Sequence, residues 1–137
     1  MKKLILILCI LFCVTQAGNS PPIKTLIIAR DEPINPYERL FEAICMVESH
    51  NNPGAFNKKE RATGIVQIRP IRLKDYDKRT GKSYTLHDCF DKKISREVFL
   101  FYAQKYPASQ LSRIAKRWNG SGRKTENYWK RVKSNLK

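Results

Sequence analysis

The sequence NPYERLFEAICMVESHNNPG, residues 35–54, contains the pattern of a complete amphipathic helix with a start and a stop. Asn35 suits a helix N-cap and Pro36 suits the first helical position. The cluster of turn-forming residues after Ser49 ends the pattern. The sequence therefore predicts a helix from Pro36 to Ser49, with Glu48 in its last turn. The apolar residues that recur at helical spacing are Leu40, Phe41, Ile44, Cys45 and Val47.

The rest of the chain predicts further helices and one extended segment. Residues 55–68 lack a helical period and predict a loop or short extended segment. Prolines, glycines and apolar periodicity then mark the remaining helices. The fold class expected is mainly α, α+β at most, with about five helices. The additional helices are predicted from Pro70 to Gly81, from Ile94 to Tyr106, from Ser109 to Trp118, and from a cap at Thr125 onward.

Residues 1–17 have the pattern of a secretory signal peptide. Two lysines precede an apolar run from Leu4 to Val14, and small residues end at Ala17. The run is shorter than the roughly 20 residues that span a bilayer. We expect cleavage after Ala17, an extended leader at residues 18–35, and one domain at residues 36–137. The expected location is periplasmic or extracellular.

The charge of the chain indicates an anionic partner. The sequence has 27 Lys and Arg against 12 Asp and Glu, and loss of Lys2 and Lys3 with the signal would leave 25 minus 12, or +13. Nucleic acid and peptidoglycan both fit this charge. Export favours the cell wall, and no nucleic-acid-binding motif is present. Peptidoglycan is therefore the expected partner, and nucleic acid is not expected.

Cysteine and histidine are too few for a recognisable metal centre. Outside the signal there are Cys45, Cys89, His50 and His87, and no spacing among them requires a metal. A disulfide between the two cysteines and a pair of buried thiols both remain open. We predict no metal and no cofactor.

Glu48 is the candidate catalytic acid. An acid that cleaves a sugar bond must hold its proton near neutral pH, which requires surroundings that raise its pKa. Glu48 follows Met46 and Val47 and lies at a helix C-terminus, a poor place for an ionised carboxylate. The residues alone also allow a solvated glutamate at a helix end.

Four motifs in this chain resemble, in order, those of the soluble-type lytic transglycosylases, a lysozyme-like family. They are ESHNNPGAFN at 48–57, GIVQI at 64–68, RWNGSG at 117–122 and TENYWKRV at 125–132. The resemblance spans residues 36–132. It implies a lysozyme-like domain that cleaves the β-1,4 bond between N-acetylmuramic acid and N-acetylglucosamine and leaves 1,6-anhydromuramic ends. Glu48 would act as both acid and base, so that one essential carboxylate replaces the usual glycosidase pair.

The resemblance also implies roles for five further residues. Ser49 corresponds to a residue that contacts the catalytic carboxylate or the substrate, Gln67 and Asn119 to amides that line the sugar groove, and Tyr128 to a hydroxyl near the glutamate. Trp118 stands where a tyrosine is usual, which keeps a stacking surface but loses a hydroxyl. Without the motifs, Gln67 could point outward, Tyr128 could be core and Asn119 could belong to a turn.

Two alternative functions stay open at this point. Glu60 and Arg61 stand where the resembled family more commonly has small residues. Glu60, Asp75 or Asp77 could supply a second carboxylate for a hydrolytic lysozyme of the same fold. A non-catalytic basic wall-binding protein would also explain the charge. The chain is expected to be a monomer, and an envelope secretion or conjugation machinery is a further candidate partner.

Overall fold

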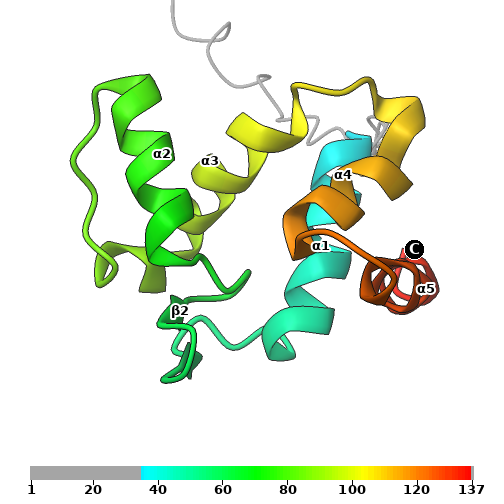
Figure 1. Cartoon of the computed structure of the whole chain (residues 1–137), viewed down its shortest axis with the longest axis horizontal. Coiled ribbons are helices and arrows are strands. Elements are labelled where there is room, and N and C mark those ends of the chain that lie inside the picture. The colour runs from blue at the N-terminus through cyan, green and yellow to red at the C-terminus, as the bar shows by residue number, and fades with distance from the viewer. Residues whose placement is uncertain (1–34, 137) are drawn as a thin grey trace, which may run out of the picture. The chain divides into compact units, whose positions relative to one another are not determined.

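The computed structural model describes residues 35–136, which fold mainly into α-helices (Figure 1). The signal predicted at residues 1–17 and the leader predicted at residues 18–35, apart from Asn35, lie outside the described residues. The mainly α class is confirmed. The elements are α1 (Pro36–Ser49), β1 (Phe56–Asn57), β2 (Ala62–Thr63), α2 (Pro70–Thr80), α3 (Lys92–Ala103), α4 (Leu111–Asn119) and α5 (Lys124–Ser134), with short 3-10 turns η1 (Asp88–Phe90) and η2 (Ala108–Gln110).

Helix α1 begins and ends where the sequence predicts. The Asn35 side chain accepts a hydrogen bond from the Tyr37 amide at 3.0 Å, which caps the first turn. His50 takes the left-handed conformation at φ 55°, and its amide donates to the Met46 carbonyl. Glu48 is thereby fixed in the final turn of the helix.

Helix α3 is shifted toward the N-terminus from its predicted span. It begins at Lys92 rather than Ile94, because the Asp91 carboxylate accepts from the Lys93 amide at 2.6 Å and caps the helix. It ends at Ala103 rather than Tyr106, whose carbonyl instead accepts from the Tyr37 hydroxyl at 2.7 Å.

Helices α4 and α5 also differ from their predicted starts. The 3-10 turn η2 occupies Ala108–Gln110, so α4 begins at Leu111 rather than Ser109. Helix α5 begins at Lys124, which places Thr125 inside the first turn instead of at the cap. The Thr125 hydroxyl donates to the Gly122 carbonyl at 2.7 Å, so it stabilises the turn before the helix.

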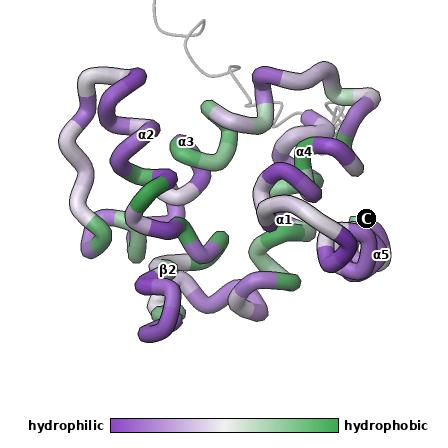
Figure 2. The backbone as a smooth tube through the Cα atoms, viewed as in Figure 1, coloured by the Kyte–Doolittle hydropathy of each residue, from purple (hydrophilic) through white to green (hydrophobic). Residues whose placement is uncertain are grey.

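The hydrophobic core surrounds α3, which packs against α1 on one side and α2 on the other. Hydrophobic residues are concentrated on α1 and α3, whereas α5 is mostly hydrophilic (Figure 2). Phe99 of α3 lies at the centre, with its ring centroid 5.6 Å from that of Phe41 and 5.1 Å from that of Trp118. Each such buried side chain contributes on the order of 2 kcal/mol of hydrophobic stabilisation. None of the helices between residues 35 and 136 is both long and apolar enough to cross a membrane.

The predicted extended segment forms a small hairpin. Strands β1 and β2 pair antiparallel, and Thr63 makes a further bridge to Ile68. Gly64 follows with φ 80°, and a Cβ atom there would overlap the Cys89 carbonyl. The same carbonyl accepts from the Ser95 hydroxyl at 2.7 Å. Glycine at residue 64 therefore lets the segment pack against η1, just before α3.

The two cysteines of the described residues are buried free thiols, not a disulfide. Cys45 lies on the core face of α1 and Cys89 in η1. Burial raises the pKa of each thiol to about 12. Of the two possibilities left open by the sequence, the structure has the buried thiols.

Candidate active site

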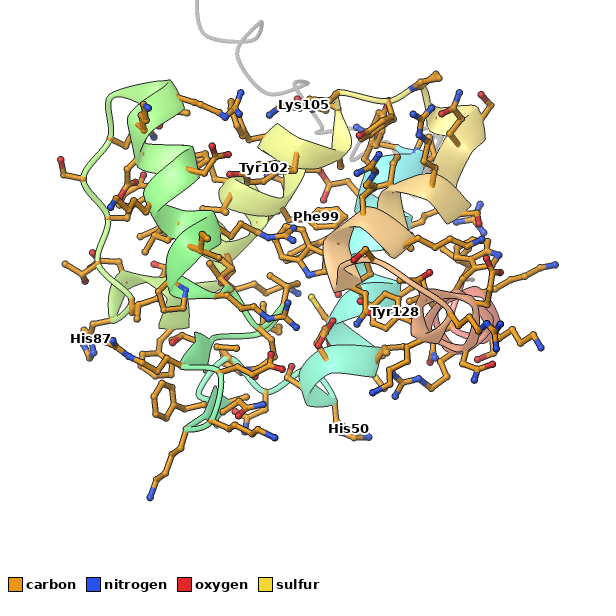
Figure 3. All side chains as sticks on the ribbon, in the orientation of Figure 1. His50, His87, Phe99, Tyr102, Lys105 and Tyr128 are labelled. Carbon is orange, nitrogen blue, oxygen red and sulfur yellow. The ribbon has the colours of Figure 1, made fainter. Side chains whose placement is uncertain are left out.

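The carboxylate of Glu48 contacts α5, the last helix of the described residues. The Tyr128 hydroxyl donates a hydrogen bond of 2.7 Å to Oε1 of Glu48. Tyr128 is buried and extends from α5 toward the end of α1 (Figure 3). A residue of α5 therefore positions the carboxyl group of a residue in α1.

The surroundings of Glu48 raise its pKa. Burial is the largest cause, because desolvation penalises the charged carboxylate. The Tyr128 hydrogen bond and the positive charges of Arg69, Arg131 and Arg72 act in the opposite direction but do not cancel the effect of burial. Glu48 therefore holds its proton to a higher pH than an ordinary glutamate, as a general acid requires.

Burial also keeps Tyr128 in its neutral form. Desolvation and the adjacent carboxylate both raise the pKa of its phenol well above the usual value. Tyr128 consequently remains a hydrogen-bond donor throughout the range in which Glu48 titrates.

A pocket of about 120 Å³ opens beside Glu48. It contains four of the six residues that the sequence singled out, namely Glu48, Gln67, Trp118 and Asn119. We call it the Glu48 pocket. Its full lining is Glu48, Asn57, Glu60, Ala62, Gln67, Arg69, Arg72, Trp118 and Asn119.

Ser49 does not line this pocket. Its hydroxyl donates to the Ile65 carbonyl at 2.8 Å and accepts from the Asn52 amide at 3.2 Å. The side chain thus ties the end of α1 to the segment that carries Gln67. In this arrangement Ser49 supports the backbone around Glu48 rather than contacting its carboxylate.

Gln67 is held by the hairpin that precedes it. It takes a positive φ of 53°, and its amide nitrogen donates to the carbonyls of Gly64 at 3.0 Å and Ala55 at 3.3 Å. The amide oxygen is then the atom that can accept a hydrogen bond from a ligand. Gln67 belongs to the pocket wall and does not point outward from an extended segment.

The indole nitrogen and the ring of Trp118 both make contacts within the protein. The indole nitrogen donates to the Val66 carbonyl at 3.0 Å, and the side chain is buried. The Arg72 guanidinium lies 4.1 Å from the ring centroid and donates to the Trp118 carbonyl at 2.9 Å. Trp118 therefore anchors Arg72 at the pocket wall in addition to lining it.

Arg69 and Arg72 are pocket residues that the sequence analysis did not identify. The sequence predicted a helix from Pro70 to Gly81 without assigning either arginine to the site. Arg69 directly follows the GIVQI motif and Arg72 lies one turn into α2, so their positions relative to the motif were an available signal. No carboxylate among residues 35–136 forms an ion pair with Arg72.

One of the three candidate second carboxylates reaches the Glu48 pocket. Glu60 lines it and forms an ion pair with Arg69 at 2.8 Å. Asp75 is instead held by Arg79 and by the Tyr102 hydroxyl, and Asp77 accepts from the Tyr84 amide. Glu60 is thus the acid that a hydrolytic mechanism would have available.

A larger pocket of about 370 Å³, the α2–α4 pocket, shares Arg72 and Trp118 with the Glu48 pocket. Residues from α2, α3 and α4 line it, among them Tyr102 of α3, and so does Lys105, which follows that helix (Figure 3). The shared wall makes the two pockets neighbours. Its full lining is Ile71, Arg72, Asp75, Tyr102, Ala103, Lys105, Tyr106, Ile114, Arg117 and Trp118.

One comparison with known proteins identifies a family for this chain. The family model described as the transglycosylase SLT domain matches residues 25–125, which include Glu48, the hairpin and the Trp118 motif. The comparisons with curated proteins and with solved structures gave no match. The family model covers well over half of the chain and supports a lytic-transglycosylase type of activity on peptidoglycan in general. The chain belongs to the transglycosylase SLT domain family.

Proposed function

We propose that this protein cleaves the β-1,4 bond between N-acetylmuramic acid and N-acetylglucosamine, with Glu48 as the single acid and base. The observation that carries the proposal is the partly buried Glu48 carboxyl, with its raised pKa and its 2.7 Å bond from Tyr128, at the wall of a pocket. A carboxyl of this kind can donate a proton at neutral pH and still remain accessible to a ligand.

In the proposed reaction the Glu48 proton passes to the glycosidic oxygen, and the bond from that oxygen to the muramic anomeric carbon breaks. The muramic C6 hydroxyl then attacks the anomeric carbon and returns its proton to Glu48. The products are a free N-acetylglucosamine hydroxyl and a 1,6-anhydromuramic end. Tyr128 supports the ionised intermediate of Glu48, because its hydroxyl donates to the carboxylate.

The remaining pocket residues have supporting roles in this proposal. The Gln67 amide oxygen and the Asn119 side chain are placed to accept or donate hydrogen bonds to sugar groups. Arg72 and Trp118 form the wall across which the strand continues into the α2–α4 pocket. Ser49 acts indirectly, by fixing the backbone that follows Glu48.

Hydrolysis is the second candidate, and Glu60 is the observation that favours it. Its carboxylate shares the Glu48 pocket and could activate a water molecule. Its ion pair with Arg69 argues for a structural role, because the paired carboxylate is already engaged.

Reducing-end chemistry tests the proposal. Purified peptidoglycan treated with the protein should release soluble fragments without a matching rise in reducing sugar ends, and Glu48→Gln should release none. Release accompanied by equal numbers of new reducing ends would establish a lysozyme instead. Wall binding without release by the unsubstituted protein would identify a non-catalytic wall-binding protein.

We also propose export before activity, with removal of residues 1–17 and function as a monomer in the periplasm or outside the cell. The apolar run from Leu4 to Val14 and the basic composition support this location. N-terminal sequencing of protein recovered from the cell envelope should begin at Gly18. An envelope secretion or conjugation machinery would need such a local opening in the wall, and crosslinking in envelope preparations would identify it as a partner.

A further inference from the structure

Positive charge is concentrated in the C-terminal part of the described chain. Residues 108–136 contain eight Lys and Arg and one acid, Glu126, for a net +7, whereas residues 35–107 contain 14 Lys and Arg and nine acids, for a net +5. The hydrophilic colouring of α5 in Figure 2 reflects this composition. Within residues 108–136, Lys116 is the one cation that forms an ion pair with a described residue, Glu126.

A third pocket lies within this basic region. It has a volume of about 720 Å³ and is lined by Arg113, Lys116, Arg117 and four uncharged residues. We call it the Arg113 pocket. No acid lines it, so nothing in its wall offsets the two arginines.

Arg113 is held in place without a carboxylate. Its guanidinium lies 4.8 Å from the centroid of the Tyr106 ring and donates to the Gln110 side chain at 3.1 Å. A guanidinium positioned by a ring and an amide keeps other donors available for an anion. Arg117 likewise forms no ion pair with any residue between 35 and 136.

The Arg113 pocket lies next to the α2–α4 pocket. Arg117 lines both the Arg113 pocket and the α2–α4 pocket, which in turn shares Arg72 and Trp118 with the Glu48 pocket. The acid-free pocket is therefore adjacent to the α2–α4 pocket, which is adjacent to the pocket of the carboxyl group proposed as catalyst.

We infer that the Arg113 pocket binds a carboxylate of the stem peptides on the glycan strand that Glu48 cuts. This series of adjacent pockets, which begins at Glu48, favours an anion carried by the substrate strand itself over a separate polymer. Stem peptides supply such carboxylates along the strand. This inference rests on the proposed function and adds to it a preference for peptide-bearing strands over strands without peptides.

The preference is measurable as a ratio of kcat/KM on two substrates. Uncrosslinked glycan strands are prepared with their stem peptides, and a matched portion is stripped of peptides by an amidase. The exposed pair Arg113→Gln with Arg117→Gln should lower the ratio of peptide-bearing to stripped kcat/KM by about three- to ten-fold, as expected for one or two solvated ion pairs. Added salt should lower the same ratio in the unsubstituted protein, because it screens exposed charges.

A charge-matched control separates this site from net charge. Lys78→Gln with Lys93→Gln removes two exposed cations that line none of the three pockets, and it should leave the ratio unchanged. Loss of fold or of general activity in the arginine variant would lower both rates together and would not move the ratio. Equal ratios in the arginine variant and the unsubstituted protein would overturn the inference.

Binding gives a second, independent readout. Glu48→Gln protein should retain peptide-bearing strands more tightly than stripped strands, and the added arginine substitutions should remove that difference. Should the arginine substitutions instead abolish binding of soluble polyphosphate while the strand difference stays, the pocket belongs to a phosphate polymer and the inference is wrong. Failure of the proposed function looks different, since neither strand would then be cut by the unsubstituted protein.

Discussion

The Tyr128 hydroxyl donates to Oε1 of Glu48 at 2.7 Å, a contact between residues 80 positions apart. This hydrogen bond joins the first and last helices of the domain at the candidate catalytic group. It also stabilises the ionised carboxylate and thereby limits how far burial raises the pKa of Glu48.

Tyr128→Phe should therefore lower activity and move its pH dependence upward. Loss of the hydroxyl removes one force that lowers the pKa of Glu48, so the alkaline limb of the kcat/KM profile should shift to higher pH. A hydrogen bond to a charged group contributes about 1.5 to 3 kcal/mol, which corresponds to a roughly ten- to hundred-fold loss of rate if it acts fully in the transition state. An unchanged pH limb would show that the hydroxyl does not act on Glu48.

Substitutions of Arg69 and of its ion-pair partner Glu60 should shift the alkaline limb of the kcat/KM profile in opposite directions. Arg69→Gln removes a positive charge that lowers the pKa of Glu48, so the limb should move to higher pH. Glu60→Gln leaves Arg69 without its partner and removes a negative charge from the pocket, so the limb should move to lower pH. Shifts in the same direction for both variants would contradict this electrostatic account.

Glu60→Gln also separates the two candidate reactions. A transglycosylase that uses Glu48 alone should retain cleavage in this variant, within the effect of the pKa shift. A lysozyme that activates water through Glu60 should lose about two to four orders of magnitude in rate, the usual contribution of a general base. The cleavage rate of the unsubstituted protein and that of Glu60→Gln should be compared, each at its own optimum pH.

Glu48→Gln should stabilise the fold at neutral pH. The pKa of Glu48 is raised in the folded state, so the folded protein binds the proton more tightly than the unfolded chain. Stability from this group is complete below the unfolded pKa of about 4.3 and decreases as pH rises through the folded pKa. The neutral amide avoids that loss, so Tm of the variant should exceed that of the unsubstituted protein near pH 7 and approach it near pH 4. A Tm difference that does not change with pH would contradict the raised pKa.

Gly64→Ala should destabilise the fold by about 2 to 4 kcal/mol, because it combines a steric overlap with an unfavourable positive φ. The added Cβ would overlap the Cys89 carbonyl and displace the segment that carries Gln67. Gly81→Ala is the matched control, since it has a similar φ of 74° and no atom within 4 Å of an added Cβ. Its cost should be about 1 kcal/mol from the backbone alone. Equal losses in urea unfolding would show that the close approach at Gly64 is unimportant.

Local sequence signals predicted the helices, because caps, prolines and apolar spacing act within a few residues. The span of α1 was predicted correctly, from the cap at Asn35 to the turn after Ser49. The starts of α3 and α5 were missed, because Asp91 and the turn at Gly122 decide them through individual hydrogen bonds.

The site required information that no local pattern contains. The approach of Tyr128 to Glu48 was suggested by family resemblance and is a contact between distant parts of the chain. Arg72 was missed because its position depends on stacking against Trp118, a tertiary contact. A serine hydroxyl can bind either a ligand or the backbone. In this structure the Ser49 hydroxyl donates to the nearby Ile65 carbonyl. The catalytic role of Glu48 and the substrate-binding roles of the other five residues stay predictions.

Glu48 should produce 1,6-anhydro ends, and mass spectrometry of the released muropeptides detects them. Peptidoglycan is digested by the protein and, in parallel, by Glu48→Gln. The account predicts muropeptides about 18 Da lighter than hydrolytic products, the mass of the water that a hydrolase adds, and none from the variant. Products with the full hydrolytic mass, or anhydro products that persist in Glu48→Gln, would contradict it.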